Sequence, residues 1–243
     1  MPRYARTLTD KQVYHVMLRG NNREKIFIDE EDKGRIIDTL IEKRKGEAFY
    51  LYAYCVMDNH IHLVIKEGQD PLARIVKRIG TSYAYYFNKK YKRIGHVFQD
   101  RFRSEVVEDD KYLLALIRYV HQNPLKPGIG TIEGYLWSSY RDYLNQRKAL
   151  VESEEILSLF SSSRSKALEE FARFNHETVE EIFLDVMEEK EIDQENVKEY
   201  IVKILSTRQL EVGQLKDPSN KEIREELIRL LLNKSSLSKR DCY

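Results

Sequence analysis

Two strand-like runs separated by only two residues constrain the fold of this chain most strongly. Residues 48–57 (AFYLYAYCVM) and 60–68 (HIHLVIKEG) are rich in aromatic and β-branched side chains, as strands are. Asp58 and Asn59 between them form a dipeptide suited to a tight hairpin turn. The centre of the chain is therefore predicted to be an antiparallel hairpin.

Segments with the period of a strand or a helix lie on both sides of this hairpin. Residues 11–20 alternate apolar and polar side chains and end at Gly20, which predicts a strand followed by a turn. Apolar residues at helical spacing then follow the candidate N-cap Asp29. The helical period returns after the hairpin, over residues 71–92.

A fourth strand and a third helix complete the pattern. Residues 102–108 predict the strand, and residues 109–123 predict a capped helix that stops at Pro124, because the residue before proline avoids the α region. The order β-α-β-β-α-β followed by a helix is that of the ferredoxin-like split βαβ fold. We therefore expect an α+β protein with an antiparallel sheet and helices on one face, since right-handed crossovers leave few other connections.

The character of the sequence changes at about residue 149. From there, short amphipathic helical segments with acidic outer faces alternate with polar clusters, which predicts an all-helical C-terminal region. We expect two domains, residues 1–148 and residues 149–243. Residues 220–243 look like the first helix and the turn of a helix-turn-helix, which would then be a truncated one.

The net charge of +1 conceals two regions of opposite sign. Residues 1–145 carry 25 Lys and Arg against 19 Asp and Glu, whereas the remainder carries 16 against 21. Residues 71–103 concentrate nine basic side chains with seven aromatic rings between them. Basic groups neutralise phosphates and aromatic faces stack on unpaired bases, so this mixture favours a single-stranded nucleic-acid surface. The alternative is a solvated helix face whose aromatic side chains point into the core.

Cysteine content and hydropathy narrow the class of protein. Cys55 and Cys242 are too few and too far apart for a disulfide framework or a four-cysteine zinc site. No stretch approaches the roughly 18 uncharged apolar residues of a membrane helix. These features predict a soluble protein of the reducing cytoplasm with no membrane partner.

His60 and His62, two of only six histidines, stand one residue apart at the start of the second hairpin strand. Alternate residues of a strand project from one face, so the two imidazoles would lie side by side. Such a pair can bind a divalent metal if a third ligand arrives from elsewhere and open positions remain. As a bare pattern, H-x-H is more often a pair of exposed or hydrogen-bonded histidines.

The helix predicted over residues 109–123 offers a third ligand and a nucleophile. Tyr119 and Asn123 are four residues apart, one helical turn, so a hydroxyl and an amide oxygen could point together at a metal. The alternative is that Tyr119 fills the edge of the core and Asn123 caps the helix before Pro124.

Five motifs occur together in a fixed order, namely "LRGNNR", "MDNHIHLVI", "GHVFQDRFRSEVVE", "YVHQNPLKPG" and "WSSYRDY". In this combination the chain resembles the REP-associated tyrosine transposases, relatives of the single-strand transposases in the HUH endonuclease superfamily. The resemblance covers residues 4–145, and the joint occurrence of the motifs is specific where H-x-H alone is not. Asp100 departs from the pattern, because relatives usually have glycine there.

The resemblance implies a metal-dependent DNA strand transferase. His60 and His62 match the metal ligands, Tyr119 matches the nucleophile, and Asn123 falls where the third ligand is expected, although glutamine is common there in the superfamily. The implied metal is Mg²⁺ or Mn²⁺, and the implied reaction cleaves and rejoins single-stranded or hairpin DNA through a 5′-phosphotyrosine intermediate. Some relatives exchange the tyrosine helix between subunits, so the choice between a monomer and a homodimer stays open.

Ten basic residues are candidates for contacts with single-stranded DNA or DNA hairpins: Arg19, Arg23, Lys77, Arg78, Lys89, Lys90, Lys92, Arg93, Arg101 and Arg103. A long basic side chain on a helix is also often simply solvated. Two other functions stay open: a non-catalytic regulator that binds DNA hairpins with the same fold, and a metal-dependent phosphodiesterase whose nucleophile is water.

Overall fold

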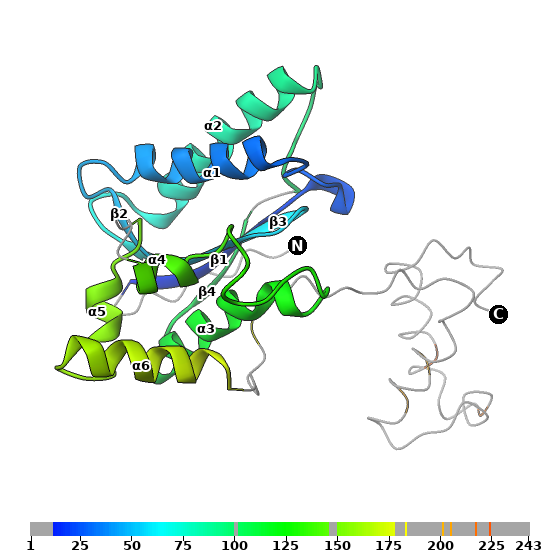
Figure 1. Cartoon of the computed structure of the whole chain (residues 1–243). Coiled ribbons are helices and arrows are strands. Elements are labelled where there is room, and N and C mark those ends of the chain that lie inside the picture. The colour runs from blue at the N-terminus through cyan, green and yellow to red at the C-terminus, as the bar shows by residue number, and fades with distance from the viewer. Residues whose placement is uncertain are drawn as a thin grey trace. The chain divides into compact units, whose positions relative to one another are not determined.

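The computed structural model of the protein describes residues 12–99, 102–145 and 150–177, together with a few isolated positions after them. The chain divides into two compact units, residues 1–185 and residues 186–243. Figure 1 labels the helices and strands of the first unit. Every helix and strand named below belongs to the first unit. Most of the helical segments predicted after residue 177, including the helix-turn-helix, lie outside the described residues, so the predicted two-domain division stays a prediction.

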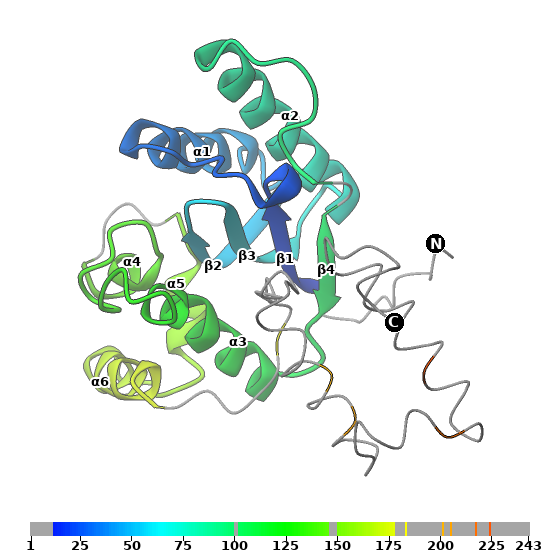
Figure 2. The ribbon, with the colours of Figure 1, turned by 90° about the vertical axis from the view of Figure 1, so that its right-hand side faces the viewer.

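A four-stranded antiparallel sheet organises the first unit, with the spatial order β2-β3-β1-β4. The strands are β1 (Val13–Arg19), β2 (Phe49–Val56), β3 (His60–Glu67) and β4 (Arg103–Val106). Two crossover helices, α1 (Glu30–Lys43) and α2 (Leu72–Lys90), connect β1 to β2 and β3 to β4. Figure 2 shows both helices on one face of the sheet, which confirms the predicted ferredoxin-like α+β fold.

The hairpin between β2 and β3 turns at the predicted Asp58 and Asn59. The amide of Met57 donates to the carbonyl oxygen of His60 at 2.8 Å, which closes the turn. The carbonyl oxygen of Asp58 also accepts from the amides of Ile26 and Phe27, each at 2.9 Å. These bonds tie the start of β3 to the segment that precedes α1, so the position of the first histidine in β3 is fixed from both sides.

Helix α3 (Asp110–Gln122) covers the opposite face of the sheet, where Figure 2 shows it with α4 (Tyr140–Asn145), α5 (Ser153–Leu157) and α6 (Arg164–Asn175). The carboxylate of Asp109 accepts from the amide of Tyr112 at 2.7 Å and caps the helix, which ends before Pro124 as predicted. The sheet therefore has two buried faces. Six of the seven residues of β1 are buried, although its alternating sequence is typical of a strand with one exposed face.

Cys55 is a buried free thiol in β2, and Cys242 lies outside the described residues. Burial raises the pKa of the Cys55 thiol, so the group is inert at neutral pH. Across the described part of the chain, no helix has both the length and the apolar content needed to cross a membrane.

A buried histidine joins α3 to the elements around it. Nδ1 of His121 lies 2.8 Å from Oδ1 of Asn175 on α6, and Nε2 lies 2.8 Å from the hydroxyl of Ser139. An amide oxygen only accepts, so Nδ1 of His121 carries the proton and Nε2 accepts from Ser139. The Ser139 hydroxyl in turn accepts from the amide of Tyr54 in β2 at 3.0 Å. This network sets the position of α3 relative to the sheet.

Acid is expected to destabilise the protein through His121. Burial lowers the pKa of His121 from 6.5 to about 4, so between these values the folded state binds fewer protons than the unfolded chain. The contribution to stability is full above pH 6.5 and is lost as pH falls through this window, by on the order of 2 kcal/mol between pH 7 and pH 5. Urea unfolding at the two pH values measures this loss.

The control for this prediction is His121→Gln, which cannot titrate. We expect it to be less stable than the natural protein at pH 7 and to lose less stability on moving to pH 5. Some pH dependence should remain, because burial also lowers the pKa of His62. Equal losses in the variant and the natural protein would contradict the assignment to His121.

Candidate active site

The histidine pair lies at the start of β3, on the face of the sheet that α3 covers. The ring centroids of His60 and His62 are 4.9 Å apart, with the ring planes at 88°. His62 is fully buried and His60 is 8% exposed. The structure therefore brings the two imidazoles together in the protein interior, as the strand period predicts.

Helix α3 brings Tyr119 to the histidines. Its ring centroid lies 5.6 Å from that of His62, and the residue is 4% exposed. One turn later, Nδ2 of the buried Asn123 donates to the carbonyl oxygen of Tyr119 at 3.0 Å, which leaves its amide oxygen as the atom that could bind a metal. The side chain of Asn123 thus caps the C-terminal end of α3, which is the alternative role considered for it from the sequence. Only its amide nitrogen is used in this hydrogen bond.

Glutamine 122 does not compete with Asn123 as a ligand. Its Nε2 donates to the carbonyl oxygens of Asn175 and Glu177, each at 2.7 Å. Gln122 therefore faces the end of α6 rather than the histidines. The candidate third ligand is therefore Asn123, whose amide lies next to Tyr119. In the superfamily that the motifs resemble, glutamine is the more common ligand at this position.

Three residues of the site escape the sequence prediction. Nε2 of His15 in β1 lies 2.9 Å from Nδ1 of His62, and Oδ1 of Asn59 lies 2.6 Å from Nδ1 of His60. Nζ of Lys126 lies 4.3 Å from the ring centroid of Tyr119. The strand period places His15 on one face of β1, but only the pairing of β1 with β3 shows that this is the face of the histidine pair.

Burial keeps His62 neutral. Desolvation is the main cause that lowers its pKa well below 6.5, and the positive charges that His60, His15 and Lys126 can carry act in the same direction. A histidine must be neutral to bind a metal ion, so this environment suits a ligand.

Tyr112, the other tyrosine of α3, is a poorer nucleophile candidate. Burial and a hydrogen bond to Glu105 raise the pKa of the Tyr112 hydroxyl. Both tyrosines pack against Phe183, with ring centroids 5.2 Å apart for Tyr112 and 4.9 Å apart for Tyr119. Tyr119 is the tyrosine that contacts the histidines.

The residues present fit a divalent metal ion. Nε2 of His62 is buried and has no hydrogen-bond partner among the described residues, so a nitrogen of a neutral ring is available. Within residues 12–177, where the structure describes them, no group of three or more His, Cys, Asp and Glu side chains could hold a metal. Among the described residues, the buried amide of Asn123 offers a neutral oxygen as a candidate third ligand.

Two of the predicted DNA-contacting residues lie at the end of the sheet that holds His60. Arg19 is the partner of His60 in the β1–β3 register, so both side chains lie on the same face. Arg23 is exposed in the short turn that follows. Gly20 between them is required, because a Cβ there would collide with the carbonyl oxygen of Glu24.

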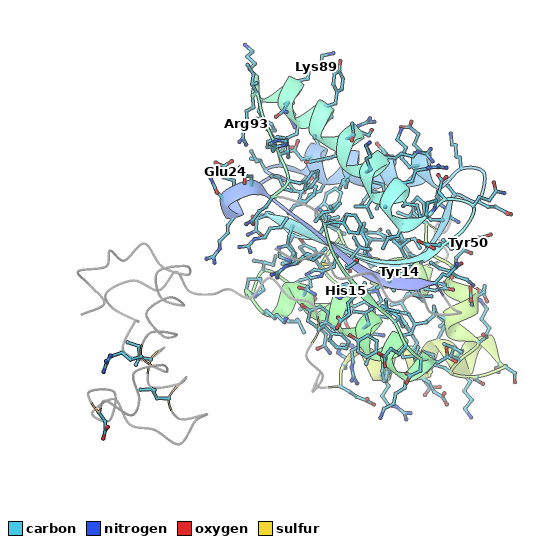
Figure 3. All side chains as sticks on the ribbon, turned by 180° about the vertical axis from the view of Figure 1, so that it is seen from behind. Tyr14, His15, Glu24, Tyr50, Lys89 and Arg93 are labelled. Atoms are coloured by element: carbon cyan, nitrogen blue, oxygen red, sulfur yellow. The ribbon has the colours of Figure 1, made fainter. Side chains whose placement is uncertain are left out.

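The other predicted contacts lie in α2, in the segment after it and at the start of β4. Helix α2 lies on the face of the sheet opposite α3 (Figure 2). Three of these residues form ion pairs: Arg78 with Asp70, Lys90 with Asp29, Glu31 and Asp32, and Arg93 with Glu24. Figure 3 shows Arg93 and Glu24 near the Lys89 end of α2. Lys77, Lys89, Lys92 and Arg103 are exposed and form no ion pair with the described residues, and Arg101 lies outside them. DNA binding by all ten residues stays a prediction.

Comparison with known proteins places this site in a family. The family model described as "Transposase IS200 like" matches residues 9–123. A protein of Haemophilus influenzae assigned to the REP-associated tyrosine transposases is 30% identical over 135 residues, which cover 47% of this chain and 76% of that protein. The family model and this relative together define an IS200-like transposase. Within that class, the chain belongs to the REP-associated tyrosine transposases.

A solved structure has the same fold. It is described as a REP-associated tyrosine transposase bound to a REP hairpin, and it matches 62% of this chain and 90% of its own with a TM-score of 0.50. The two sequences are 18% identical over the match, so the likeness is one of fold.

Replacing Asn123 should weaken metal binding, whereas replacing its neighbour should not. We expect Asn123→Ala to lower the affinity for Mn²⁺ about tenfold through loss of one oxygen ligand. Titration of Mn²⁺ followed by the loss of the free-ion electron paramagnetic resonance signal measures this. Gln122→Ala is the matched control, and a greater loss of affinity in Gln122→Ala would reassign the third ligand.

Proposed function

We propose that the protein cleaves and rejoins single-stranded, hairpin-containing DNA through a covalent bond between Tyr119 and a 5′ phosphate, with Mg²⁺ or Mn²⁺ as cofactor. The observation that carries this proposal is the convergence of Tyr119 from α3 with His62 from β3, at a centroid distance of 5.6 Å. Family membership supports the reaction. The related structure with a REP hairpin supports the choice of substrate.

The site residues divide the work of this reaction. His60, His62 and Asn123 would hold the metal, which when bound polarises a phosphate oxygen and stabilises the charge of the transition state. The Tyr119 oxygen attacks phosphorus and forms a new P–O bond, the phenolic proton leaves, and the bond from phosphorus to the 3′ oxygen breaks to give a free 3′-OH. Attack by a 3′-OH on the phosphotyrosine reverses these changes and joins two strands, so the phosphodiester energy is conserved.

Lys126 supplies a charge that favours the nucleophilic form of Tyr119. A phenol has an ordinary pKa of about 10, so at neutral pH attack needs help with removal of its proton. An ammonium group 4.3 Å from the ring centroid attracts the ring and favours phenolate over phenol. Because Lys126 is exposed, the same group can also meet a phosphate that approaches from solvent.

The central test is formation of a denaturation-resistant protein–DNA adduct. Labelled single-stranded oligonucleotides, copied from the DNA on either side of the gene and containing its hairpins, are incubated with the protein and Mn²⁺. We expect Tyr119→Phe to bind the DNA with unchanged affinity and to form no adduct, because it lacks the attacking oxygen. Tyr112→Phe is the matched control on the same helix and should form the adduct.

The same gel separates the rival functions. Cleavage without an adduct would indicate a phosphodiesterase that uses water, and binding without cleavage would indicate a regulator. An adduct that persists in Tyr119→Phe would move the nucleophile elsewhere.

A second prediction concerns Lys126. We expect Lys126→Met to form the adduct about tenfold more slowly, because it removes the positive charge beside the Tyr119 ring. Lys126→Arg should retain most of the rate, since it keeps the charge. Lys111→Met removes an exposed lysine from α3, the helix that carries Tyr119, and serves as the control in a time course of adduct formation. Equal rates in the two methionine variants would remove Lys126 from the reaction.

A further inference from the structure

A third histidine lies beside the pair and comes from a different strand. In the β1–β3 register His15 is paired with Val64 and Met17 with His62, so His15 is a diagonal neighbour of His62 on the same face. Figure 3 labels His15 on β1 beside Tyr14, whose side chain belongs to the other face. His15 is fully buried, in a strand position where valine or threonine would avoid the cost of burying an imidazole.

The two rings meet edge to edge. Nε2 of His15 and Nδ1 of His62 are 2.9 Å apart, while the ring centroids are 5.1 Å apart and the planes are inclined by 27°. At that centroid distance, with the nitrogens so close, the hydrogen bond runs nearly along the line that joins the rings. One of the two nitrogens donates and the other accepts.

His60 has a similar partner whose role is unambiguous. Its Nδ1 lies 2.6 Å from Oδ1 of Asn59, the second residue of the hairpin turn. An amide oxygen only accepts hydrogen bonds, so Nδ1 of a neutral His60 carries the proton and Nε2 carries the lone pair. The turn residue therefore sets the tautomer of the first histidine.

We propose that His15 and Asn59 are positioning residues that hold the protons of His62 and His60 on Nδ1, so that both Nε2 lone pairs are offered to one metal ion. The inference rests on the proposed metal-dependent function. A neutral imidazole has one N–H and one lone pair, and with the proton on Nε2 the ring would present N–H to the metal. His62 can be a ligand through Nε2 only if its Nδ1–H donates to His15, which then carries its own proton on Nδ1.

The arrangement has a physical precedent in the way metal-binding histidines are held. The ring nitrogen that does not bind the metal donates to a fixed acceptor, which orients the ring. Loss of such an acceptor lowers metal affinity by about 10- to 100-fold. Here the two acceptors are His15 in β1, which is far from the H-x-H motif in sequence, and Asn59 in the β2–β3 turn, which directly precedes it.

The first test measures Mn²⁺ binding to the full chain without DNA, by the loss of the free-ion paramagnetic signal. We expect His15→Phe, which keeps a ring but has no acceptor, to bind Mn²⁺ about 10- to 100-fold more weakly. His15→Gln should recover much of this affinity, because its amide oxygen can accept from His62. His96→Phe removes an exposed histidine and should leave the affinity unchanged.

The outcomes separate this inference from the function on which it rests. If the natural protein and His15→Phe bind Mn²⁺ equally tightly, the positioning role of His15 is wrong and the proposed function survives. If the natural protein binds no Mn²⁺, the metal-dependent function itself is wrong. Circular dichroism of each variant establishes that it is folded, and His15→Gln carries the test if His15→Phe is not.

The second test reads the tautomers directly, in the natural protein without metal. Long-range proton–nitrogen NMR spectra distinguish imidazoles protonated on Nδ1 from those protonated on Nε2. We expect Nδ1–H for His60 and His62, with His121 as an internal reference because its Nδ1 faces the amide oxygen of Asn175. His62 found with its proton on Nε2 would overturn the inference for His15, and His60 found so would overturn it for Asn59.

Discussion

The position of α3 against the sheet is the constraint on which the candidate site depends. The nucleophile candidate is on this helix and the histidines are on β3, so no segment of the chain holds both. The buried hydrogen bonds of His121 to Asn175 and to Ser139, which itself accepts from β2, fix the helix between the sheet and α6. Removing such a partner leaves a buried polar group unsatisfied, which costs about 1–3 kcal/mol. This cost opposes any movement of α3 away from the sheet.

Covering both faces of the sheet also decides the chemistry of the site. Imidazoles on an exposed face would be hydrated and would titrate near pH 6.5. Behind α3 they are desolvated, so His62 is neutral and each inner nitrogen, Nδ1 of His60 and Nδ1 of His62, has a protein partner. The same burial therefore keeps His62 neutral beside His60 and Tyr119.

Local patterns predict the parts of this site but not their assembly. The period of β3 places His60 and His62 on one face, and the helical turn places Tyr119 with Asn123, because both relations lie within one element. The proximity of His15 to the pair cannot be predicted in this way, because it depends on the order of strands in the sheet. Strand β1 pairs with β3 because β2 occupies the edge of the sheet. The ion pairs of Lys90 with the first turn of α1 are likewise a tertiary contact that a basic run in the sequence does not reveal.

Tyr119 and Asn123 behave as one unit. The Asn123 amide donates to the Tyr119 carbonyl oxygen, so the spacing between the proposed nucleophile and the proposed third ligand is set within a single turn of the chain. A shift of α3 would move both groups together and change only their distance from the histidines. Loosening the His121 network should therefore impair metal binding and strand cleavage together. Loss of the His15 hydrogen bond would act only on His62, one of the proposed metal ligands, and would leave α3 in place.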